Sequence, residues 1–310
     1  IITSDWSSDV CSSDLVAFDK GGSVERTELF ADYKANREET PEAIRLAIPY
    51  IHEILKALHI PIIEKEGYEA DDIIGTLSKQ AEKQNYQVYM VTPDKDYAQL
   101  VSDNIFIYRP SRGGNDVEIW GVKEVQEKFE VQNPLQVIDF LGMMGDAVDN
   151  IPGLPGVGEK TAKKLLADFG SMENLLAHTD QLKGKLRENI ESNKEKGILS
   201  KQLATIMLDV PVTFDEEDFA MSKPDFEAVG RIFEELEFRQ LLQNFLRTYQ
   251  PEMPTAPPPL TGNKPTEGQL SLFTQGDLFA QPQVMSDKKN STNTQLPRSE
   301  ERRVGKECRS

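Results

Sequence analysis

Cysteine is almost missing from this 310-residue sequence, which has two, and histidine is scarce, with three. Both cysteines, Cys11 and Cys308, lie in the terminal stretches. The body of the chain therefore offers no disulfide framework, thiolate zinc site or cysteine nucleophile. Long apolar runs are also missing, because none approaches the roughly 18 residues that span a membrane. No signal peptide is visible, and we expect a cytoplasmic protein.

The two terminal stretches have no hydrophobic period. Asp5 to Leu15 reads "DWSSDVCSSDL", and Arg298 to Ser310 reads "RSEERRVGKECRS". Both resemble conceptual translations of sequencing-adapter DNA, and a natural disordered tail is the alternative interpretation. We therefore exclude residues 1–15 and 298–310 from the fold reasoning. Residues 16–297 are interpreted as a natural fragment that has lost its true start.

Positive charge is in short supply. The formal net charge is -17, and the terminal stretches contribute -3 and +2 of it, which leaves -16 for the rest. Taken alone, this balance argues against a nucleic-acid partner, because phosphate binding is driven by basic surface. Net charge is a poor guide, however, when many carboxylates gather in one metal site and the basic residues gather elsewhere.

Strands alternate with helices in residues 16–121. Strands are predicted to end at "VAFD", "IPII" and "YQVYMV", amphipathic helices lie between them, and "NIFIYRPSRGGNDVEIW" is typical of a hairpin. This alternation predicts an α/β domain around a largely parallel central sheet. Residues 122–249 are helical almost throughout. Residues 250–297 are rich in proline and polar residues, which predicts a disordered linker.

Carboxylates gather at the predicted strand ends and in two further segments. Asp19, Asp94 and Asp96 follow strands, and ligands bind beyond the carboxyl ends of strands in an open α/β sheet. The segments "YEADDII" and "MGDAVDN" supply the others, namely Glu69, Asp71, Asp72, Asp146 and Asp149. Neighbouring like charges raise each other's pKa, so this many carboxylates favour a hard cation, Mg²⁺ or Mn²⁺. Two such ions form the usual clamp for attack of water on a phosphodiester. The set has no thiol or imidazole, which disfavours zinc.

Each acidic motif has a simpler interpretation when it is taken alone. Caps and turns often contain aspartate, so "TPDKD" is weak evidence for metal, and "EADD" is typical of a helix N-cap. Four acidic clusters at one predicted sheet edge are much stronger evidence together. A phosphatase of the Asp-x-Asp type, with Asp94 as nucleophile, is an alternative that gives no reason for "EADD".

The segment "GLPGVGEKTAKKLL" directly follows the last acidic cluster. It is not a Walker A loop, because Glu159 separates Gly158 from the following lysine. It matches a hairpin between two helices, in which glycines let backbone N–H groups approach a phosphate and lysines add positive charge. The residues concerned are Gly153, Gly156, Gly158, Lys160, Lys163 and Lys164. Such a hairpin grips duplex backbone without reading sequence, and a plain helix-loop-helix with glycine caps is the alternative.

Six segments occur in a fixed order between Val16 and Phe238: "VAFD", "YKANR", "GYEADD", "TPDKDYAQL", "MGDAVDNIPGLPGVGEKTA" and "LEF". In them the chain resembles the flap-endonuclease family, which includes the 5′-nuclease domain of bacterial DNA polymerase I. The resemblance implies a PIN-like 5′-nuclease domain followed by a helix-hairpin-helix subdomain. It implies a structure-specific 5′-3′ exonuclease and 5′-flap endonuclease, monomeric and nucleoid-associated. Its substrates would be nicked or branched DNA and RNA primers, in replication and repair.

The resemblance also implies roles for particular residues. Two or three Mg²⁺ ions would bind to the eight carboxylates, namely Asp19, Glu69, Asp71, Asp72, Asp94, Asp96, Asp146 and Asp149. The hairpin from Gly153 to Lys164, which includes Thr161, would grip the duplex. At the base of a helical arch, Tyr33 would stack on a base, while Lys34 and Arg37 would neutralise the scissile phosphate. A solvated basic turn is the alternative for these three residues.

One departure from the family pattern concerns the first strand. The family has a further metal-ligating aspartate on that strand, and here residues 1–15 stand in its place. The missing strand would belong to the interior of the sheet. We therefore expect this chain to fold poorly or to be impaired in catalysis. A non-catalytic fragment that binds duplex DNA is the alternative function.

The proline-rich tail contains the pentapeptide "QLSLF". Exposed leucine and phenylalanine in a disordered segment favour binding in the pocket of a partner. The pentapeptide resembles the motif by which bacterial replication proteins bind the sliding clamp. Clamp binding is therefore a separate hypothesis, carried by Gln269, Leu270, Leu272 and Phe273. A simple connection to a following domain is the alternative.

Overall fold

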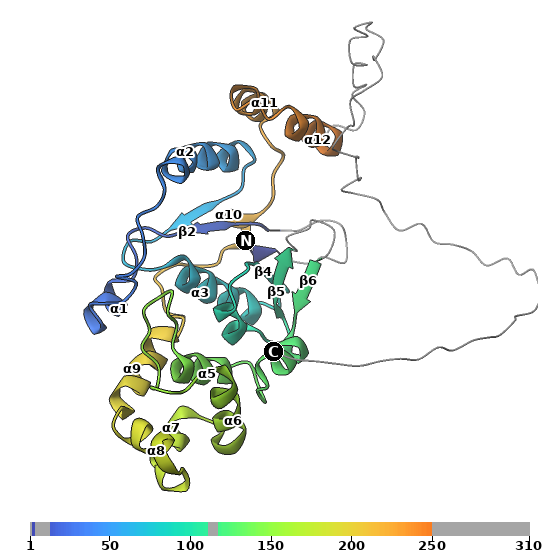
Figure 1. Ribbon diagram of the computed structural model, residues 1–310. Helices are drawn as coiled ribbons and strands as arrows, with labels where there is room; N and C mark the ends of the chain where they lie inside the picture. The colour runs from blue at the N-terminus through green and yellow to red at the C-terminus, as the bar shows by residue number, and fades with distance from the viewer. Residues whose placement is uncertain (1, 4–12, 111–116, 250–310) are drawn as a thin grey trace, which may run out of the picture. The chain divides into compact units, whose positions relative to one another are not determined.

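The computed structural model describes residues 2–3, 13–110 and 117–249. Within these ranges, every strand lies before residue 121 and helices follow (Figure 1). The strands, in chain order, are β1 (Ile2–Thr3), β2 (Val16–Phe18), β3 (Ile62–Glu64), β4 (Val88–Val91), β5 (Ile105–Pro110) and β6 (Val117–Trp120). No helix in the described ranges is long and apolar enough to cross a membrane.

The strands form two small sheets. One has the order β1-β4-β5-β6, and the other is the pair β2-β3. The pairs β2-β3 and β4-β5 are parallel, as predicted from the alternation of strands and helices. The pairs at the two edges of the larger sheet are antiparallel, with β1 on β4 and β6 on β5. The β5-β6 pairing, with Tyr108 opposite Ile119, confirms the predicted hairpin.

Helices make up most of the remaining structure. In chain order they are α1 (Val24–Leu29), α2 (Glu42–Ala57), α3 (Ala70–Lys83), α4 (Val122–Phe129), α5 (Gln136–Met144), α6 (Glu159–Phe169), α7 (Met172–Ala177), α8 (Gly184–Glu191), α9 (Lys194–Ala204), α10 (Glu216–Phe219), α11 (Phe226–Glu235) and α12 (Arg239–Tyr249). The described ranges also contain the 3₁₀ helices η2 (Asp96–Leu100) and η3 (Thr179–Gln181). The mixed α/β fold followed by a helical part agrees with the predicted fold class.

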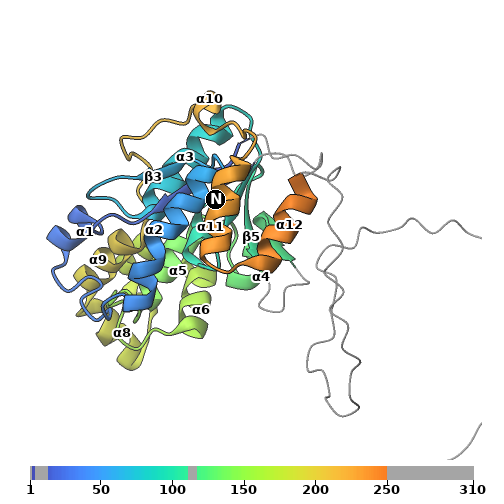
Figure 2. The same cartoon turned by 90° about the horizontal axis from the view of Figure 1, so that it is seen from above.

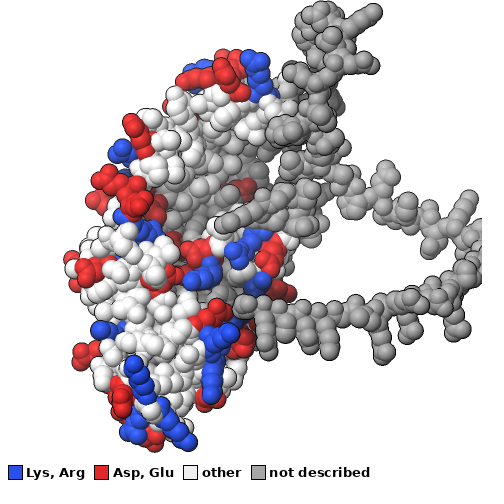
Figure 3. Space-filling view, in the orientation of Figure 1, with Lys and Arg blue, Asp and Glu red and all other residues white. Residues whose placement is uncertain are grey.

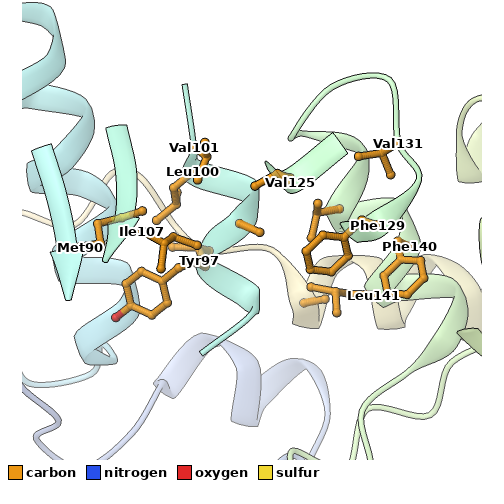
Figure 4. Packing of buried hydrophobic residues seen from close by; sticks show 14 of the residues in the cluster. Met90, Tyr97, Leu100, Val101, Ile107, Val125, Phe129, Val131, Phe140 and Leu141 are labelled. Atoms are coloured by element: carbon orange, nitrogen blue, oxygen red, sulfur yellow. The ribbon is translucent and has the colours of Figure 1, made fainter. Parts of the chain in front are cut away.

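One hydrophobic core runs from the larger sheet into the helices. Met90 and Ile107 of the sheet and Leu141 of α5 are buried members of it, as Figure 4 shows. Tyr97 and Leu100 of η2 also belong to this core. Burying one large apolar side chain contributes about 1.5–3 kcal/mol. The burial of Tyr97 and Leu100 in this core therefore fixes the position of η2, the 3₁₀ helix that begins at Asp96.

The helices α5 and α9 pack with their backbones close together. A Cβ atom added to Gly142 of α5 would lie 2.8 Å from the Cα atom of Lys201 on α9, so glycine is required at this crossing. Lys201 then reaches carboxylates on two other helices, with Nζ 2.6 Å from Asp139 and 2.7 Å from Glu173. This network ties α5, α7 and α9 together, and α5 ends at Met144, just before the loop with Asp146 and Asp149.

A second, smaller hydrophobic cluster joins α11 and α12, at the end of the described chain, to α2. Ala57 of α2 packs with Val229 and Phe233 of α11 and with Phe245 of α12. Figure 2 shows α2 and α11 side by side. The backbone N–H of Asp225 also donates to the carbonyl of Ala57 at 2.8 Å. The cluster therefore supports α2 through helices that lie about 170 residues further along the chain.

The last residues of the excluded N-terminal stretch belong to the fold. Leu15 is 1% exposed in the main core, and Ser13 forms an isolated bridge with Ala220. The backbone N–H of Asp14 donates to the carbonyl of Phe219 at 3.2 Å. These three residues, like Ile2 and Thr3 of β1, pair or pack with the rest of the fold, although residues 1–15 were excluded from the fold reasoning. The physical reason is that a single apolar residue next to a strand can be buried without any hydrophobic period around it.

Candidate active site

The N-terminus of α3 carries three of the predicted carboxylates. Glu69 is the N-cap residue, and Asp72 accepts a hydrogen bond from its backbone N–H at 3.3 Å, which forms a capping box. Asp72 is 0% exposed, and it also accepts from the backbone N–H of Met207 at 2.9 Å. The simpler interpretation of "EADD" as a helix cap is therefore confirmed for these two residues.

Asp72 forms a buried double ion pair with Arg26 of α1. Arg26 donates from Nη1 to Oδ2 at 2.8 Å and from Nη2 to Oδ1 at 2.7 Å. Because both oxygens of Asp72 are already engaged, the carboxylate does not face the open side of the site. Asp72 therefore braces the start of α3 against Arg26, and its part in metal binding stays a prediction.

Arg26 was not predicted from the sequence, although its side chain makes several buried hydrogen bonds beside the start of α3. It is 5% exposed, and it donates further hydrogen bonds to the carbonyls of Leu203 at 3.1 Å and Thr205 at 2.8 Å. Burial alone would lower the pKa of Arg26, but the hydrogen bonds and charge of Asp72 outweigh it and raise the pKa. Arg26 is a lone basic residue on a short helix, so no local pattern marks it.

Glu69 is the centre of a second buried cluster. Its carboxylate accepts from Arg26 Nη1 at 3.0 Å, from the Tyr33 hydroxyl at 3.0 Å and from Lys34 Nζ at 2.6 Å. Burial and the charge of Glu69 raise the pKa of Tyr33 far above its ordinary value. Tyr33 is 9% exposed, and stacking of its ring on a base stays a prediction. Its role in this arrangement is to donate to Glu69.

Asp19 and Asp71 lie beside Glu69. Asp19 follows β2, and its Oδ1 accepts from the backbone N–H of Ala70 at 2.7 Å, at the start of α3. Burial, together with the charges of Glu69 and Asp19, raises the pKa of Asp71 to about 6. The coupling of these charges means that the three carboxylates Asp19, Glu69 and Asp71 share one electrostatic environment.

Asp94 and Asp96 follow β4, as predicted, but the segment between them is not extended. Asp94 Oδ1 accepts from the backbone N–H of Asp96 at 3.0 Å, and Asp96 begins η2. Burial and the charge of Asp94 raise the pKa of Asp96 to about 7, with smaller contributions from Asp146 and Asp149. Asp96 Oδ1 is buried and has no hydrogen-bond partner in the described part of the chain. The carboxylates nonetheless lie close enough to act on one another, as the prediction required.

The loop with Asp146 and Asp149 is closed by two glycines. Gly145 and Gly153 have φ values of 73° and 63°, and a Cβ on Gly153 would lie 2.6 Å from the backbone nitrogen of Gly145. Between them, Asp146 and Ile151 exchange backbone hydrogen bonds at 3.0 and 2.7 Å. Ser200 of α9, fully buried, accepts from the N–H of Gly153 at 2.9 Å. The acidic loop is therefore anchored to the helical part at its base.

Basic side chains pair with the carboxylates of this loop. Lys95 Nζ lies 3.2 Å from Asp146, and Lys34 Nζ lies 3.7 Å from Asp149, which also pairs with Arg37. Burial would raise the pKa of Asp146, but the N–H of Val148 and the ammonium of Lys95 outweigh it and hold the pKa below its usual value. Lys34, with a side chain that is 17% exposed, thus lies against the acidic cluster, whereas Arg37 pairs with the cluster from an exposed position.

Two features bear on metal binding. Among the described residues, no group of three or more carboxylate, imidazole or thiol side chains has the geometry to hold a metal ion. The carboxylates of Glu69, Asp146 and Asp149 instead contact lysine and arginine. Every donor at this edge is a carboxylate oxygen, which is the ligand that hard divalent cations prefer. The donor chemistry therefore fits such ions, although the geometry of a metal cage is not already in place.

Arg109 at the end of β5 is a further residue that sequence analysis missed. Its guanidinium lies 4.4 Å from the ring centre of Trp120, and it donates to the carbonyl of Pro93 at 2.9 Å. Lys128 Nζ lies 4.6 Å from the same ring. Pro93 directly precedes Asp94, so Arg109 connects the edge of the larger sheet to the acidic segment.

The predicted hairpin lies between the acidic loop and α6. Gly156 has a φ of 80°, and Gly158 is the N-cap residue of α6. Lys160 and Lys164 are exposed and have no ion-pair partner in residues 117–249 or the other described ranges. Lys163 differs, because it pairs with Glu130 at 3.3 Å and Glu159 at 3.0 Å.

These lysines line a groove of about 460 Å³ together with Glu130, Glu159 and Ala167. Thr161 lies on the first turn of α6 and lines a neighbouring groove of about 560 Å³. On the face shown in Figure 3, lysine and arginine are interspersed with carboxylates. Among the three lysines of the hairpin, Lys160 and Lys164 are the ones without an ion-pair partner in the described structure, so we expect phosphate contact there to depend on these two. Gln269, Leu270, Leu272 and Phe273 lie outside the described residues.

The mixed α/β fold with an acidic edge and the helical part that follows it correspond to two family models of nucleases. The family model described as "5'-3' exonuclease, N-terminal resolvase-like domain" matches residues 7–130, and "5'-3' exonuclease, C-terminal SAM fold" matches residues 132–227. The chain belongs to the 5′-3′ exonuclease family.

Curated relatives are DNA polymerases I. Those of Bacillus caldotenax and Bacillus subtilis are each 44% identical over 230 residues, which is 74% of this chain and 26% of the relative. That of Geobacillus stearothermophilus is 43% identical over 78% of this chain and 28% of the relative. The chain thus spans about a quarter of the length of the curated relatives it matches.

Solved structures share the fold at lower identity. The T5 5'-exonuclease with bound divalent metal ions (zinc) has a TM-score of 0.55 and 23% identity, covering 72% of this chain and 83% of that one. The catalytic core of Rad2 in complex with DNA substrate has a TM-score of 0.52 and 17% identity, covering 75% and 79%. These likenesses establish the fold of this chain.

Proposed function

We propose that this chain is a structure-specific nuclease that hydrolyses phosphodiesters at 5′ flaps and nicks in DNA and in RNA primers. The observation that carries the proposal is the set of electrostatically coupled carboxylates around Asp71 and Asp96, with Lys34 and Arg37 directly beside it. Coupled carboxylates with perturbed pKa values are typical of functional sites. Membership of the 5′-3′ exonuclease family supports the same conclusion.

Two or three divalent cations, Mg²⁺ or Mn²⁺, would act as cofactors. The couplings divide the carboxylates into two groups, Asp19 with Glu69 and Asp71, and Asp94 with Asp96, Asp146 and Asp149. The buried, unpartnered Oδ1 of Asp96 supports this assignment, because a buried polar atom requires a partner. When bound, such ions would lower the pKa of the attacking water and stabilise charge on the phosphate. The T5 5'-exonuclease, which shares the fold, has been solved with divalent metal ions, zinc, bound to it.

The side chains of this protein would position and neutralise the phosphate. Lys34 and Arg37 are the cations that pair with Asp149 of the acidic loop, so they would compensate the charge of the scissile phosphate. Tyr33 would keep Glu69 oriented through its hydroxyl. Arg26 and Asp72 would hold the start of α3 in place beneath these groups.

The hairpin would hold the duplex beside the site of cleavage. Lys160 and Lys164 are exposed and unpaired in the described structure, and the glycine-rich turn with Gly153, Gly156 and Gly158 leaves its backbone accessible. Because the acidic loop and the hairpin are consecutive in the chain and both are anchored near Ser200, their separation would be fixed. The T5 D15 flap endonuclease and the catalytic core of Rad2 have both been solved in complex with DNA.

The wider setting follows from the relatives. A 5′-nuclease of this kind would act as part of a DNA polymerase I in replication and repair, as a monomer in the cytoplasm near the nucleoid. The QLSLF segment would bind the sliding clamp through Gln269, Leu270, Leu272 and Phe273. A pull-down with purified clamp tests this. Retention of the chain should be lost when Leu272 and Phe273 become alanine, and unchanged retention would exclude the idea.

A second candidate is a protein that grips duplex DNA without cutting it. The pairing of Glu69, Asp146 and Asp149 with basic side chains favours this alternative. Cleavage of a 5′-labelled flap duplex decides between the two. The nuclease predicts cutting near the junction with Mg²⁺, no cutting with EDTA and loss of cutting in Asp94→Asn. Binding that is insensitive to Mg²⁺, without cleavage, would support the alternative.

A further inference from the structure

The turn with Lys34 and the acidic loop are joined by reciprocal hydrogen bonds. Asn36 Nδ2 donates to the carbonyl of Ala147 at 2.7 Å, and Asn150 Nδ2 donates to the carbonyl of Asp32 at 2.7 Å. Each segment therefore contributes one amide side chain and one carbonyl. The backbone N–H of Lys34 adds a third bond, to the carbonyl of Asp149 at 3.0 Å.

Both segments have a left-handed residue at these bonds, which is strained at Lys34 and more readily adopted by the asparagine. Lys34 has a φ of 55° and Asn150 a φ of 57°, in the left-handed region that residues other than glycine seldom adopt. Such conformations persist only where the surrounding structure enforces them. The three cross-segment hydrogen bonds are the enforcing contacts, because they involve the strained residues themselves or their close neighbours.

The bonds lie between two sets of charged groups. The turn carries Lys34 and Arg37, and the loop carries Asp146 and Asp149. Lys34 and Arg37 already pair with Asp149 across the junction. Charge pairs alone would tolerate sliding of one segment along the other, because long side chains adapt. The short amide side chains of Asn36 and Asn150 cannot follow such a sliding movement, so their hydrogen bonds fix the register of the two segments.

We propose that Asn36 and Asn150 are positioning residues that keep the phosphate-neutralising cations in register with the carboxylates of the acidic loop. This inference rests on the proposed nuclease function and adds two residues to it. It carries a consequence for linkage: Lys34 and Arg37 pair with Asp149, so a substrate phosphate that drew these two cations to itself would free the Asp149 carboxylate for a metal cation. Each ligand would therefore strengthen the binding of the other.

The test uses variants that remove the amides without adding strain. Asn36→Ala removes one bond, and Asn150→Gly removes the other while glycine still accepts the positive φ. Asn174→Ala is the matched control, because Asn174 donates from Nδ2 to the carbonyl of Phe169 at 2.7 Å on α7, outside the site. A thermal melt of each variant shows whether the fold is intact. Asn36→Gln serves as a second variant with a longer amide.

Two measurements are needed, Mn²⁺ affinity without DNA by titration calorimetry and flap cleavage at varied Mg²⁺. For Asn36→Ala combined with Asn150→Gly, we expect about fivefold weaker Mn²⁺ binding and about tenfold lower kcat, with a melting temperature close to that of the parent. The control should match the parent. If the parent cleaves and the double variant matches it in both measurements, the positioning role is wrong. If the parent neither binds Mn²⁺ nor cleaves, the proposed function fails, and the inference fails with it.

Discussion

Replacement of Asp96 by asparagine should stabilise the metal-free protein. The Asp96 carboxylate is buried, has an unpartnered oxygen and lies near Asp94, so its ionised form is unfavourable in the native state. Its pKa is raised from 3.8 to about 7. A carboxyl group with a raised native pKa binds its proton more tightly when folded. The loss of native-state stability caused by the Asp96 carboxyl group is therefore absent below pH ~4, grows as the pH rises and is complete above pH ~7.

The magnitude follows from the shift of the pKa. At pH 8 the full shift of about three pKa units applies, and it corresponds to a loss of stability of roughly 4 kcal/mol. At pH 5 only about one unit applies, because the folded-state group is largely protonated, and the loss is roughly 1.5 kcal/mol. A neutral asparagine at this position would relieve the cost without losing a hydrogen bond at the buried Oδ1, which has no partner in the described structure. For a domain of this size, about 4 kcal/mol corresponds to a rise in Tm of about 10 °C.

Thermal denaturation in EDTA at pH 5 and pH 8 tests this reasoning. Asp96→Asn should melt above the parent at both values, and the difference should be clearly larger at pH 8. Asp180→Asn, which changes an exposed carboxylate outside the site, should have little effect at either pH. Added Mg²⁺ should raise the Tm of the parent more than that of the variant. A variant that is less stable than the parent, or a difference that does not depend on pH, would refute the argument.

Three further predictions concern basic residues. Arg26→Met leaves the buried Asp72 without a cationic partner and Glu69 with Lys34 as its remaining one, so chemical denaturation should report a loss of about 3–5 kcal/mol in the free energy of unfolding, and a loss below about 1 kcal/mol would contradict the bracing role. Lys164→Ala should weaken duplex binding and reduce the slope of log K against log salt concentration by about one. Lys163→Ala should have the smaller effect, because Lys163 is already paired with Glu130 and Glu159. Binding measured at several salt concentrations compares the two variants, and equal effects would contradict the assignment. Arg109→Ala should lower the free energy of unfolding by about 1–2 kcal/mol, as thermal melts would show, and should raise the Mg²⁺ concentration needed for cleavage. An unchanged Mg²⁺ requirement would show that the hydrogen bond from Arg109 to Pro93 does not position the acidic segment.

The sequence was informative wherever a residue's role depends on its immediate neighbours. Asp19 and Asp94 follow strands, and a short run of mostly apolar residues that stops at a polar one is enough to find a strand end. The glycines of the hairpin are recognisable because positive φ at Gly153 and Gly156 is a property of the turn itself. The β5-β6 hairpin was equally accessible, because its two strands are close in the chain.

The sequence was uninformative where a role depends on a distant partner. Asp72 and Asp71 are adjacent and chemically identical, but Asp72 meets Arg26 while Asp71 does not. Burial of Tyr33 and Leu15 likewise comes from the assembled core rather than from local pattern. Pairing of Lys163 with Glu130 depends on how α4 meets α6, which no spacing rule predicts. These roles are properties of the tertiary structure.

The contacts of Arg26 also bear on how the protein is made. Arg26 is held by the carbonyls of Leu203 and Thr205, which enter the chain 177 and 179 residues later. Domains emerge from the ribosome starting at the N-terminus, and contacts between distant residues form late. A growing chain would therefore expose Glu69 and Asp72 without their complete support until α9 has been synthesised. The nascent protein would remain unable to cut nucleic acid near the ribosome until its helical part is complete.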